Sequence, residues 1–274
     1  MANRIFTFWE PVENMPDYIS LCIETWKKFL PEYEIVLLDY KNLDNWLGKN
    51  YYDSILYEEF SLPKQADAIR CALLNRYGGI WLDADTIITS RKFKNLLNNN
   101  SDFILLGKHI GFIMANSNSK ILLKWQEEIF KKLKYYKKSR HFINLYRIFN
   151  RTKYKQLKNW NYLGNGILDK HLDIANSKDF CSIDVYLNNI LPEKSKNNNL
   201  DLSPSLLYQN FYFNNNYSLD FLENNCGIIL LHNSWTPNKY KQMDKKEFLK
   251  QEITLAKLFK YLLIDENGDK LCEE

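Results

Sequence analysis

The sequence predicts an α/β protein with a mixed, mostly parallel central sheet flanked by helices, and with additional helices in the C-terminal half. Three observations favour this class. Short apolar strands alternate with helical patterns from Arg4 to Ala115, and strands separated by helices pair in parallel within one sheet. Polar clusters follow several of these strands, where open α/β sheets bind ligands. Finally, 45% of the residues are hydrophobic, which is enough for a packed core.

The N-terminal elements follow from the spacing of the apolar residues. Arg4–Trp9 predicts a first strand, and Pro16 begins a helix that Pro31 ends. Glu34–Leu38 predicts a second strand, which completes a β-α-β unit and therefore indicates a parallel pair. Residues 42–60 are predicted to form short helices rich in Tyr and Phe.

The segment Leu62–Ser90 predicts a helix, a turn and a strand that ends in two acids. Apolar residues recur at helical spacing until Gly78-Gly79 break the helix, and Ile80–Leu82 form a short buried strand. Asp83-Ala84-Asp85 follow directly. Two carboxylates there repel each other unless a cation or hydrogen-bond donors lie between them. Mg²⁺ and Mn²⁺ bind one or two carboxylates and leave other positions to water and phosphates, so we expect a divalent metal.

Later elements are less evenly spaced. Phe103–Gly107 and Gly111–Ala115 predict two strands around a turn, and Lys120–Lys138 predicts a long amphipathic helix. Helices are expected near 141–150 and 164–176, with a loop near residue 197. Gly227–Leu231 predicts a buried strand that leads into His232-Asn233-Ser234-Trp235. The last 35 residues predict one amphipathic helix and a charged tail.

Composition narrows the range of partners and cellular compartments that we expect for this protein. The net charge of +4 is smaller than nucleic-acid binders usually carry, so no nucleic-acid partner is expected. Lys and Arg gather at 120–160 and in the C-terminal helix, which fits a solvated face, an anionic substrate or an anionic membrane. Five scattered cysteines without a CxxC predict neither a disulfide framework nor a zinc site. Without a signal-peptide pattern or a long apolar span, we expect a cytoplasmic protein, with peripheral attachment at the inner face of the plasma membrane left open.

Taken singly, each polar cluster has a structural explanation. An Asp-x-Asp often caps or ends an element, His232 alone fits a hydrogen-bonded loop, and Trp9 and Trp235 fit the edge of a core. Their combination with Asp67 and Arg70 on the preceding helix favours a functional site. An imidazole ligand in a site of oxygen ligands favours Mn²⁺ over Mg²⁺.

This combination resembles a known family. The passage ADAIRCALLNRYGGIWLDADTI is similar to the DxD-containing sugar transferases of the GT-A fold, a Rossmann-like architecture. The closest groups are the capsular polysaccharide synthesis proteins, the initiating α-mannosyltransferases of fungal type and the glucosylating bacterial toxins. FTFW, PEYEIVLLD and HNSW match further segments of these proteins, so the resemblance covers residues 3–90 and 227–236. It implies a single domain over 1–274, with a nucleotide-sugar part at about 1–120 and an acceptor-side helical part at about 121–274.

The resemblance also implies a donor-binding site. Phe8 and Trp9 end the first strand, and Trp9 would stack on the nucleotide base. Asp67 would hold hydroxyls of the donor sugar, and Arg70 would lie against the sugar or its diphosphate. Gly79 belongs to the turn beside them. Asn165, in LGNGIL, either faces the acceptor or belongs to a plain turn.

The remaining implied residues hold the metal and the phosphates. Asp83 would contact the ribose and, through water, the metal, whereas Asp85 would bind the metal directly. His232 would be a late metal ligand, although the toxins carry an acid there. Ser234 and Trp235 would close over the β-phosphate. Asp85, Asp83 and Arg70 are therefore the predicted catalytic residues, and Mn²⁺ or Mg²⁺ is the predicted cofactor.

The function implied is a retaining, metal-dependent transfer from a nucleotide-diphosphate sugar, with a UDP-sugar favoured. The acceptor would be a saccharide or lipid-linked saccharide in bacterial capsular polysaccharide, lipopolysaccharide or glycolipid synthesis. Two alternatives remain. WLDADTII also fits a haloacid-dehalogenase-type phosphatase with Asp83 as nucleophile, and LLIDENGD would then supply its late acids. A non-catalytic sugar- or nucleotide-binding protein is the other.

Overall fold

The computed structural model describes residues 3–107, 109–176, 178–183 and 203–264. The chain divides into two compact units built from interleaved segments. Unit 1 contains Met1–Glu10, Val36–Leu82 and Asn100–Ser182. Unit 2 contains Pro11–Ile35, Asp83–Asn99 and Ile183–Glu274. This division differs from the expected parts 1–120 and 121–274, and the single domain stays a prediction.

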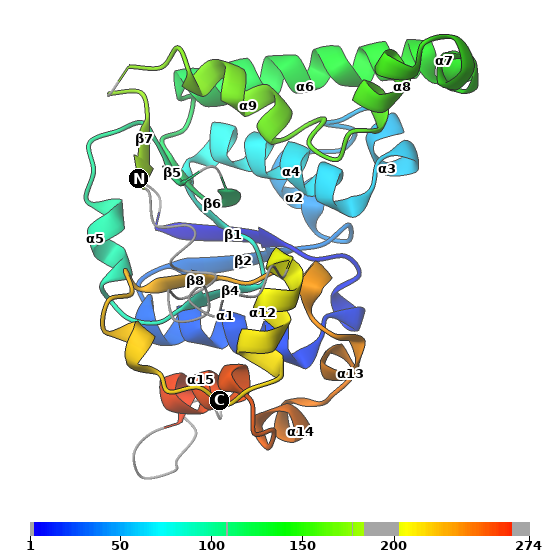
Figure 1. The fold of residues 1–274 in the computed structure, drawn as a ribbon. Coiled ribbons are helices and arrows are strands. Elements are labelled where there is room, and N and C mark those ends of the chain that lie inside the picture. Colours follow the sequence, from blue (N-terminus) through cyan, green and yellow to red (C-terminus); the bar gives the residue numbers. More distant parts are fainter. Residues whose placement is uncertain (1–2, 108, 177, 184–202, 265–274) are drawn as a thin grey trace. The chain divides into compact units, whose positions relative to one another are not determined.

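A six-stranded mixed sheet forms the centre of unit 1, in the order β2-β1-β3-β6-β5-β7 (Figure 1). Its strands are β1 (Arg4–Phe8), β2 (Glu34–Leu38), β3 (Gly79–Leu82), β5 (Phe103–Leu106), β6 (His109–Ala115) and β7 (Cys181–Ile183). β1 and β3 are parallel, with Ile5 beside Ile80 and Phe6 beside Trp81. β6 is antiparallel to both β3 and β5. The predicted α/β class with a mixed sheet is confirmed.

The helix before β3 is the core helix of unit 1. This helix, α4 (Leu62–Tyr77), contacts β1, β3 and β6, and it also packs against α6 (Lys120–Ser139). Every residue from Asp67 to Leu74 is buried, because both the sheet and α6 cover the helix. The remaining helical elements of unit 1 are α2 (Leu43–Leu47), α3 (Ile55–Glu59), η2 (Arg140–Phe142), α7 (Ile143–Phe149), α8 (Arg151–Lys158) and α9 (Asn165–Leu172).

The turn between α4 and β3 depends on Gly78. Its backbone N–H donates to the Leu74 carbonyl at 2.8 Å, and its φ of +64° lies in the left-handed region that favours glycine. A Cβ at this position would lie 2.8 Å from the backbone nitrogen of Ser117. The glycine therefore lets the chain leave α4 and begin β3 at once, which places Asp83 directly after the strand.

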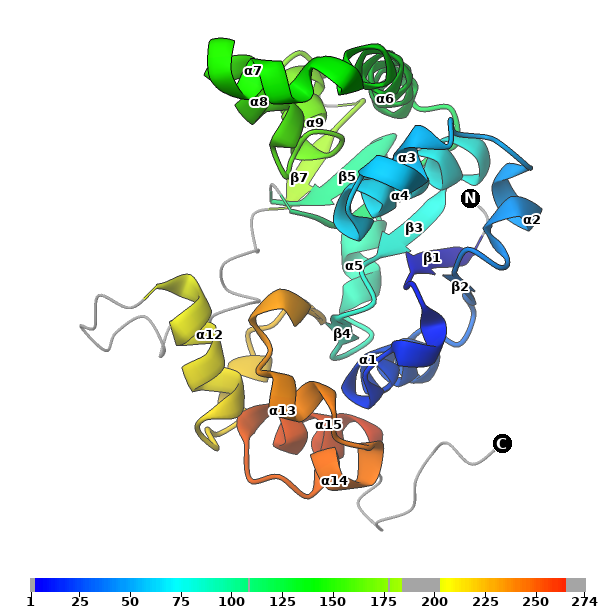
Figure 2. The same cartoon turned by 90° about the vertical axis from the view of Figure 1, so that its right-hand side faces the viewer.

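Unit 2 is mainly helical around a short two-stranded sheet (Figure 2). β4 (Thr86–Ile88) pairs with β8 (Ile228–Leu230) in antiparallel register. The helix α1 (Asp17–Phe29) is fixed to β4 by two buried hydrogen bonds. The Trp26 Nε1–H donates to the Thr86 carbonyl at 2.7 Å, and the Ile88 N–H donates to Thr25 Oγ1 at 2.9 Å. The other helical elements are η1 (Val12–Asn14), α5 (Phe93–Leu97), α12 (Pro204–Phe213), η3 (Asp220–Leu222), η4 (Asn233–Trp235), α13 (Asn238–Lys241), α14 (Lys245–Leu249) and α15 (Thr254–Leu263).

The prediction of one C-terminal helix is wrong, because α14 and α15 are separate. Ile253 is extended, with φ −126° and ψ 155°. Next to it, the backbone N–H and the hydroxyl of Thr254 both donate to the Asn215 carbonyl, at 2.7 and 2.9 Å. This tertiary contact outweighs the helical pattern. The loop expected near 197 and the charged tail lie outside the described residues. None of the described helices has the length and hydropathy needed to cross a bilayer.

Candidate active site

The predicted site residues divide between the two units, and the boundary falls at the peptide bond between Leu82 and Asp83. One set belongs to unit 1 and comprises Phe8, Trp9, Asp67, Arg70 and Gly79. The other set belongs to unit 2 and comprises Asp83, Asp85, His232, Ser234 and Trp235. Each set is therefore described within its own unit.

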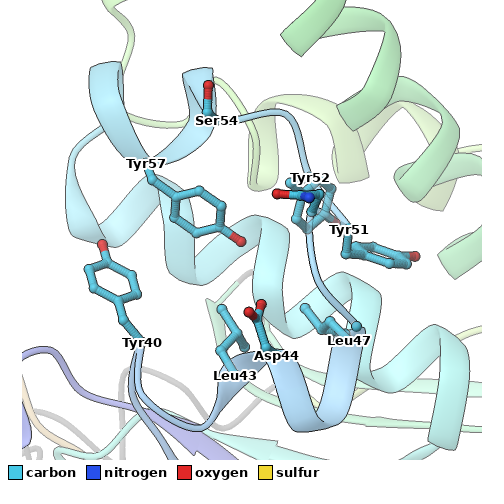
Figure 3. Close-up of a pocket in the computed structure, with 10 residues that line it drawn as sticks. Tyr40, Leu43, Asp44, Leu47, Tyr51, Tyr52, Ser54 and Tyr57 are labelled. Carbon is cyan, nitrogen blue, oxygen red and sulfur yellow. The ribbon is translucent and has the colours of Figure 1, made fainter.

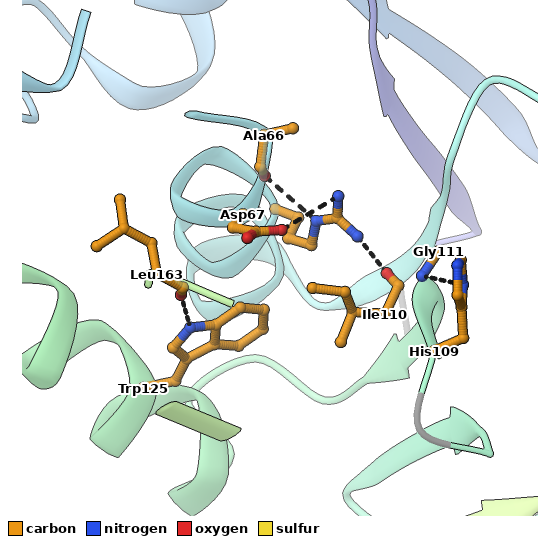
Figure 4. A network of polar contacts seen from close by, with 8 residues as sticks. Ala66, Asp67, His109, Ile110, Gly111, Trp125 and Leu163 are labelled. Carbon is orange, nitrogen blue, oxygen red and sulfur yellow. Dashed lines mark hydrogen bonds and ion pairs between the residues drawn. The ribbon is translucent and has the colours of Figure 1, made fainter. Parts of the chain in front are cut away.

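Asp67 and Arg70 form a buried ion pair on α4 (Figure 4). Arg70 Nη2 lies 3.5 Å from Asp67 Oδ1, and only 4% of Arg70 is exposed. The Arg70 Nε–H donates to the Ala66 carbonyl at 3.3 Å, Nη1 donates to the Ile110 carbonyl, and the guanidinium lies 4.9 Å from the centroid of the Trp81 ring. These contacts fix the guanidinium, so Arg70 holds the Asp67 carboxylate in place. A direct contact of Arg70 with a donor stays a prediction.

The turn before α9 lies directly against the Asp67 carboxylate. A Cβ built on Gly164 would lie 2.4 Å from Asp67 Oδ2 and 2.8 Å from Ile110 Cδ1. A side chain at this position would therefore occupy space that the Asp67 carboxylate fills. The indole N–H of Trp125 donates to the Leu163 carbonyl at 2.6 Å and fixes this turn to α6. Sequence reasoning noticed the glycine-flanked turn, but it did not predict its contact with Asp67.

The end of β1 supplies an aromatic pair and a half-buried indole. Phe8 is buried, and its ring centroid lies 5.8 Å from that of Tyr40, which follows β2. The Trp9 N–H donates to the Leu38 carbonyl at 3.0 Å, and its side chain is only partly buried. Trp9 therefore has a fixed backbone and an accessible ring. Its stacking on a base stays a prediction.

Two backbone hydrogen bonds anchor Asp85, the second of the two acids in unit 2. Its Oδ2 accepts a hydrogen bond from the Asn233 backbone N–H at 2.7 Å, and its carbonyl accepts one from the Leu231 N–H at 3.0 Å. Both acids are partly exposed, whereas Ala84 between them is buried. The Asp83 carbonyl accepts the Thr86 N–H at 3.0 Å, which closes a turn before β4. The two acids are thus presented on a short turn rather than along a continued strand.

The late HNSW segment forms η4 directly after β8. The His232 ring packs against Trp235 with centroids 4.0 Å apart, and the His232 N–H donates to the Tyr208 hydroxyl at 3.2 Å. Burial lowers the pKa of His232, and the negative charge of Asp83 opposes this shift. A lowered pKa favours the neutral imidazole, which is the form that binds a metal. Ser234 is exposed.

Three residues in the electrostatic surroundings of Asp85 were missed by sequence reasoning: Tyr18, Tyr208 and Lys241. The Tyr18 hydroxyl donates to Asn233 Oδ1 at 2.6 Å, so the residue that binds Asp85 is itself held in place. Burial, followed by the charges of Tyr208 and Asp85, raises the pKa of Tyr18 well above its usual value. Burial lowers the pKa of Lys241, and the charge of Asp85 opposes this shift. Lys241 is therefore a cation in the surroundings of Asp85. Only Asn233 lay within a motif that the sequence singled out.

The donor set fits a metal that is shared with a ligand. Among residues 3–107, 109–176, 178–183 and 203–264, no group of three His, Cys, Asp or Glu side chains has the geometry of a metal cage. Mn²⁺ and Mg²⁺ in phosphate sites, however, need only one or two carboxylates, with phosphates and water completing the shell. Asp83 and Asp85 fit that pattern, because both are partly exposed carboxylates on one short turn. His232 as an additional ligand stays a prediction.

A separate pocket in unit 1 lies between α2, α3 and the segment that joins them (Figure 3). Its cavity volume is about 260 Å³. It is lined by Tyr40, Leu43, Asp44, Leu47, Gly48, Asn50, Tyr51, Tyr52, Ser54 and Tyr57. Burial, followed by the charges of Asp44 and Tyr40, raises the pKa of Tyr57 to about 12. These described lining residues include no Lys or Arg, so the pocket lacks the cations that a diphosphate requires.

A comparison with family models identifies the family of the chain. The model of the family described as "Capsular polysaccharide synthesis protein" matches residues 1–266 of the chain. The chain therefore belongs to this family, and the family predicted from the sequence is confirmed. The class of enzyme predicted with it, a glycosyltransferase of polysaccharide synthesis, is confirmed at the same level.

Solved structures similar to this chain include three glycosyltransferases. PaToxG is 16% identical, with a TM-score of 0.39 over 64% of this chain and 70% of its own. GlyE of Streptococcus pneumoniae TIGR4 is 13% identical, with a TM-score of 0.45 over 96% of this chain and 60% of its own. A glycosyltransferase involved in glycosylation of the PBCV-1 major capsid is 14% identical, with a TM-score of 0.35 over 75% of this chain and 96% of its own. A comparison with curated proteins found no significant match.

Proposed function

We propose that this protein is a retaining, metal-dependent transferase that moves a sugar from a nucleotide-diphosphate donor to a saccharide acceptor. A UDP-sugar is the favoured donor. The acceptor is a free or lipid-linked saccharide in the synthesis of a bacterial surface polysaccharide or glycolipid. The family is shown by the comparison above. The donor, the metal and the stereochemical course are parts of this proposal.

The observation that carries the proposal is the fixed position of the Asp85 carboxylate. Asp85 lies in the turn between β3 and β4, and the Asn233 N–H holds one carboxylate oxygen at 2.7 Å. His232, whose pKa is lowered by burial, directly precedes η4, and Lys241 lies in the surroundings of Asp85. A carboxylate, a neutral imidazole and a cation in one unit are the groups that a metal-bound diphosphate requires.

The chemistry of the leaving group explains this arrangement. Glycosyl transfer releases a nucleoside diphosphate, whose developing negative charge must be stabilised. A divalent cation bound between the phosphates would stabilise that charge without a proton transfer. Lys241 would add a positive charge near Asp85, and Asp67 would hold the donor sugar through its hydroxyls. In a retaining reaction the departing diphosphate would accept the acceptor's proton on the same face, so no enzyme nucleophile is required.

The proposal is tested by a screen of nucleotide sugars without acceptor. Slow hydrolysis of one donor that increases on addition of Mn²⁺ and stops with a chelator is the expected result. Release of phosphate from simple phosphomonoesters instead would favour the phosphatase with Asp83 as nucleophile. Donor binding without any turnover would favour the non-catalytic alternative. Analysis of the anomeric product formed with an acceptor then decides between retention and inversion.

Asp85→Asn separates the metal role from the structural role. Because the amide oxygen of Asn accepts a hydrogen bond as a carboxylate does, the contact with the Asn233 N–H is kept and the fold is preserved. Metal-dependent hydrolysis should fall at least about 100-fold, which corresponds to about 2.7 kcal/mol. Asp244→Asn is the matched control, because Asp244 Oδ1 accepts the Glu247 N–H at 2.7 Å in the same unit. Full activity of Asp85→Asn would refute the metal assignment.

A further inference from the structure

A group of exposed apolar residues lies on two adjoining helical elements of unit 1. Four large apolar residues here, Phe142, Leu145, Ile148 and Phe149, are 52, 48, 73 and 82% exposed. They occupy η2 and α7, and α7 packs beside α8 near the end of α6 (Figure 1). We call these four residues the α7 surface. Exposed apolar residues occur singly on most proteins, but adjoining ones mark an interaction site.

Helical geometry places the residues of the α7 surface that belong to α7 on one side of that helix. At about 100° per residue, Leu145, Ile148 and Phe149 fall within an arc of about 100°, and Ile143 points to the opposite side. Ile143 is only 7% exposed and belongs to the hydrophobic core cluster, against which Tyr146 also packs. α7 is therefore attached to unit 1 by one side and presents its other apolar side to solvent.

The chain segment that carries this surface is strongly basic. The sequence from Ile129 to Leu168 contains 11 Lys and Arg residues and no Asp or Glu. On η2, α7 and α8, Arg140, Arg147, Arg151, Lys155 and Lys158 are exposed. Arg140 lies 3.9 Å from Glu58, a carboxylate that comes from a different part of the chain. An exposed apolar face within a basic segment is the pattern of helices that lie in the plane of an anionic membrane.

We propose that the α7 surface inserts into the interface of an anionic lipid bilayer. A second copy of this surface is a poor partner, because the two basic segments would repel each other. Nucleic acid would satisfy the charges but would leave Leu145, Ile148 and Phe149 in water. The hydrocarbon edge of a bilayer takes up the apolar side chains while its headgroups meet the cations. This inference extends the peripheral membrane attachment that the sequence left open, and it assigns the contact to α7.

Vesicle flotation of the full chain tests the proposal without any donor or activity. The protein should float with vesicles that contain about a third phosphatidylglycerol, and much less with pure phosphatidylcholine. Binding should weaken as salt rises, because exposed charges are screened. Asp85→Asn should float like the wild type, which separates this result from any failure of the transferase proposal.

Two pairs of substitutions test the apolar side chains of the α7 surface and the cations beside it. Ile148→Ser with Phe149→Ser should lower partition into anionic vesicles at least about tenfold, because both side chains otherwise enter the apolar layer. Arg147→Glu with Arg151→Glu should lower it about 25-fold or more, at about fivefold for each lost cation. All four residues are exposed, so folding should be kept.

Matched controls lie elsewhere on the chain. Ile174 is 67% exposed in unit 1, and Lys246 and Lys250 are exposed in unit 2. Ile174→Ser, and Lys246→Glu with Lys250→Glu, should float like the wild type. The proposal is overturned if the protein does not float with anionic vesicles, or if the α7 pairs bind as well as the controls. Tighter binding to DNA or RNA than to vesicles at equal salt would also overturn it.

Discussion

A methyl group added at Gly164 tests the position of Asp67. In Gly164→Ala the new Cβ would lie 2.4 Å from Asp67 Oδ2 and 2.8 Å from Ile110 Cδ1, so both side chains or the turn must move. Overpacking of this kind costs about 1–3 kcal/mol. The loss of unfolded-state entropy on replacing Gly by Ala offsets about 0.4–1 kcal/mol. We therefore expect a net loss of about 0.5–2 kcal/mol in the free energy of unfolding.

The effect on ligand binding should be selective. Asp67 is predicted to hold the hydroxyls of the donor sugar, so Gly164→Ala should weaken binding of the nucleotide sugar but not of the corresponding nucleoside diphosphate. Calorimetric titration of both ligands measures this difference. Gly166→Ala is the matched control, because its Cβ would lie 2.5 Å from the Asn161 carbonyl oxygen and would strain the same turn away from Asp67. The control should lose stability without changing the ratio of the two affinities.

A double-mutant cycle tests the steric argument independently of any ligand. Asp67→Ala removes the carboxylate that the new methyl group would meet. If the clash causes the loss of stability, the combined variant should be more stable than the sum of the two single losses predicts, by at least about 0.5 kcal/mol. Additive losses in thermal or denaturant unfolding would refute the contact. An equal loss of affinity for nucleotide sugar and nucleoside diphosphate would refute the predicted role of Asp67.

Three further predictions concern other contacts. Tyr18→Phe removes the hydroxyl that holds Asn233 Oδ1, so it should cost about 1 kcal/mol and raise the Mn²⁺ concentration needed for half-maximal hydrolysis; an unchanged metal requirement would contradict the assignment. Tyr57 has a pKa of about 12 and should therefore stay protonated until the pH approaches that value. Asp44→Asn should lower the pKa of Tyr57, because a negative charge is removed. Ultraviolet titration against Tyr57→Phe measures the phenol, and stability from this group should be lost as the pH rises from about 10 towards 12. Trp26→Phe leaves a buried strand carbonyl without its donor and should cost about 1–3 kcal/mol in chemical unfolding, whereas a change below about 0.5 kcal/mol would show that another donor replaces the indole.

Elements with strong local signals could be predicted from the sequence. Helix α1 begins and ends beside prolines, and β1, β2, β3 and β8 lie where short apolar runs predicted them. The pairing of β4 with β8 could not be predicted, because three residues carry no measurable period and their partner is more than 130 residues away. The break between α14 and α15 was missed for a related reason, since the Asn215 carbonyl that binds Thr254 is distant in sequence.

In the candidate site, too, the sequence predicted the residues but not the atoms that hold them in place. The motifs identified which side chains carry charge, but several of the groups that fix them are backbone atoms, which no motif encodes. The Asn233 N–H that binds Asp85 and the Ile110 carbonyl that binds Arg70 are of this kind. Gly164 could be noticed as a glycine in a turn. Its need for space became visible only when the Asp67 carboxylate was placed beside it.

The predicted site residues fall into two sets that can be tested separately by substitution. The residues expected to contact base and sugar (Trp9 and Asp67) fold with unit 1, together with Arg70, which is expected against the sugar or its diphosphate. The residues expected to meet the metal fold with unit 2: Asp85, His232 and Asp83, of which Asp83 is also expected to contact the ribose. Substitutions in the first set should therefore change discrimination among donors at constant metal requirement. Substitutions in the second set should change the metal requirement with every donor. Because each set is held by contacts within its own unit, these two patterns of failure should stay separate, and a variant such as Asp67→Asn that altered only the Mn²⁺ dependence would show that the roles have been assigned to the wrong units.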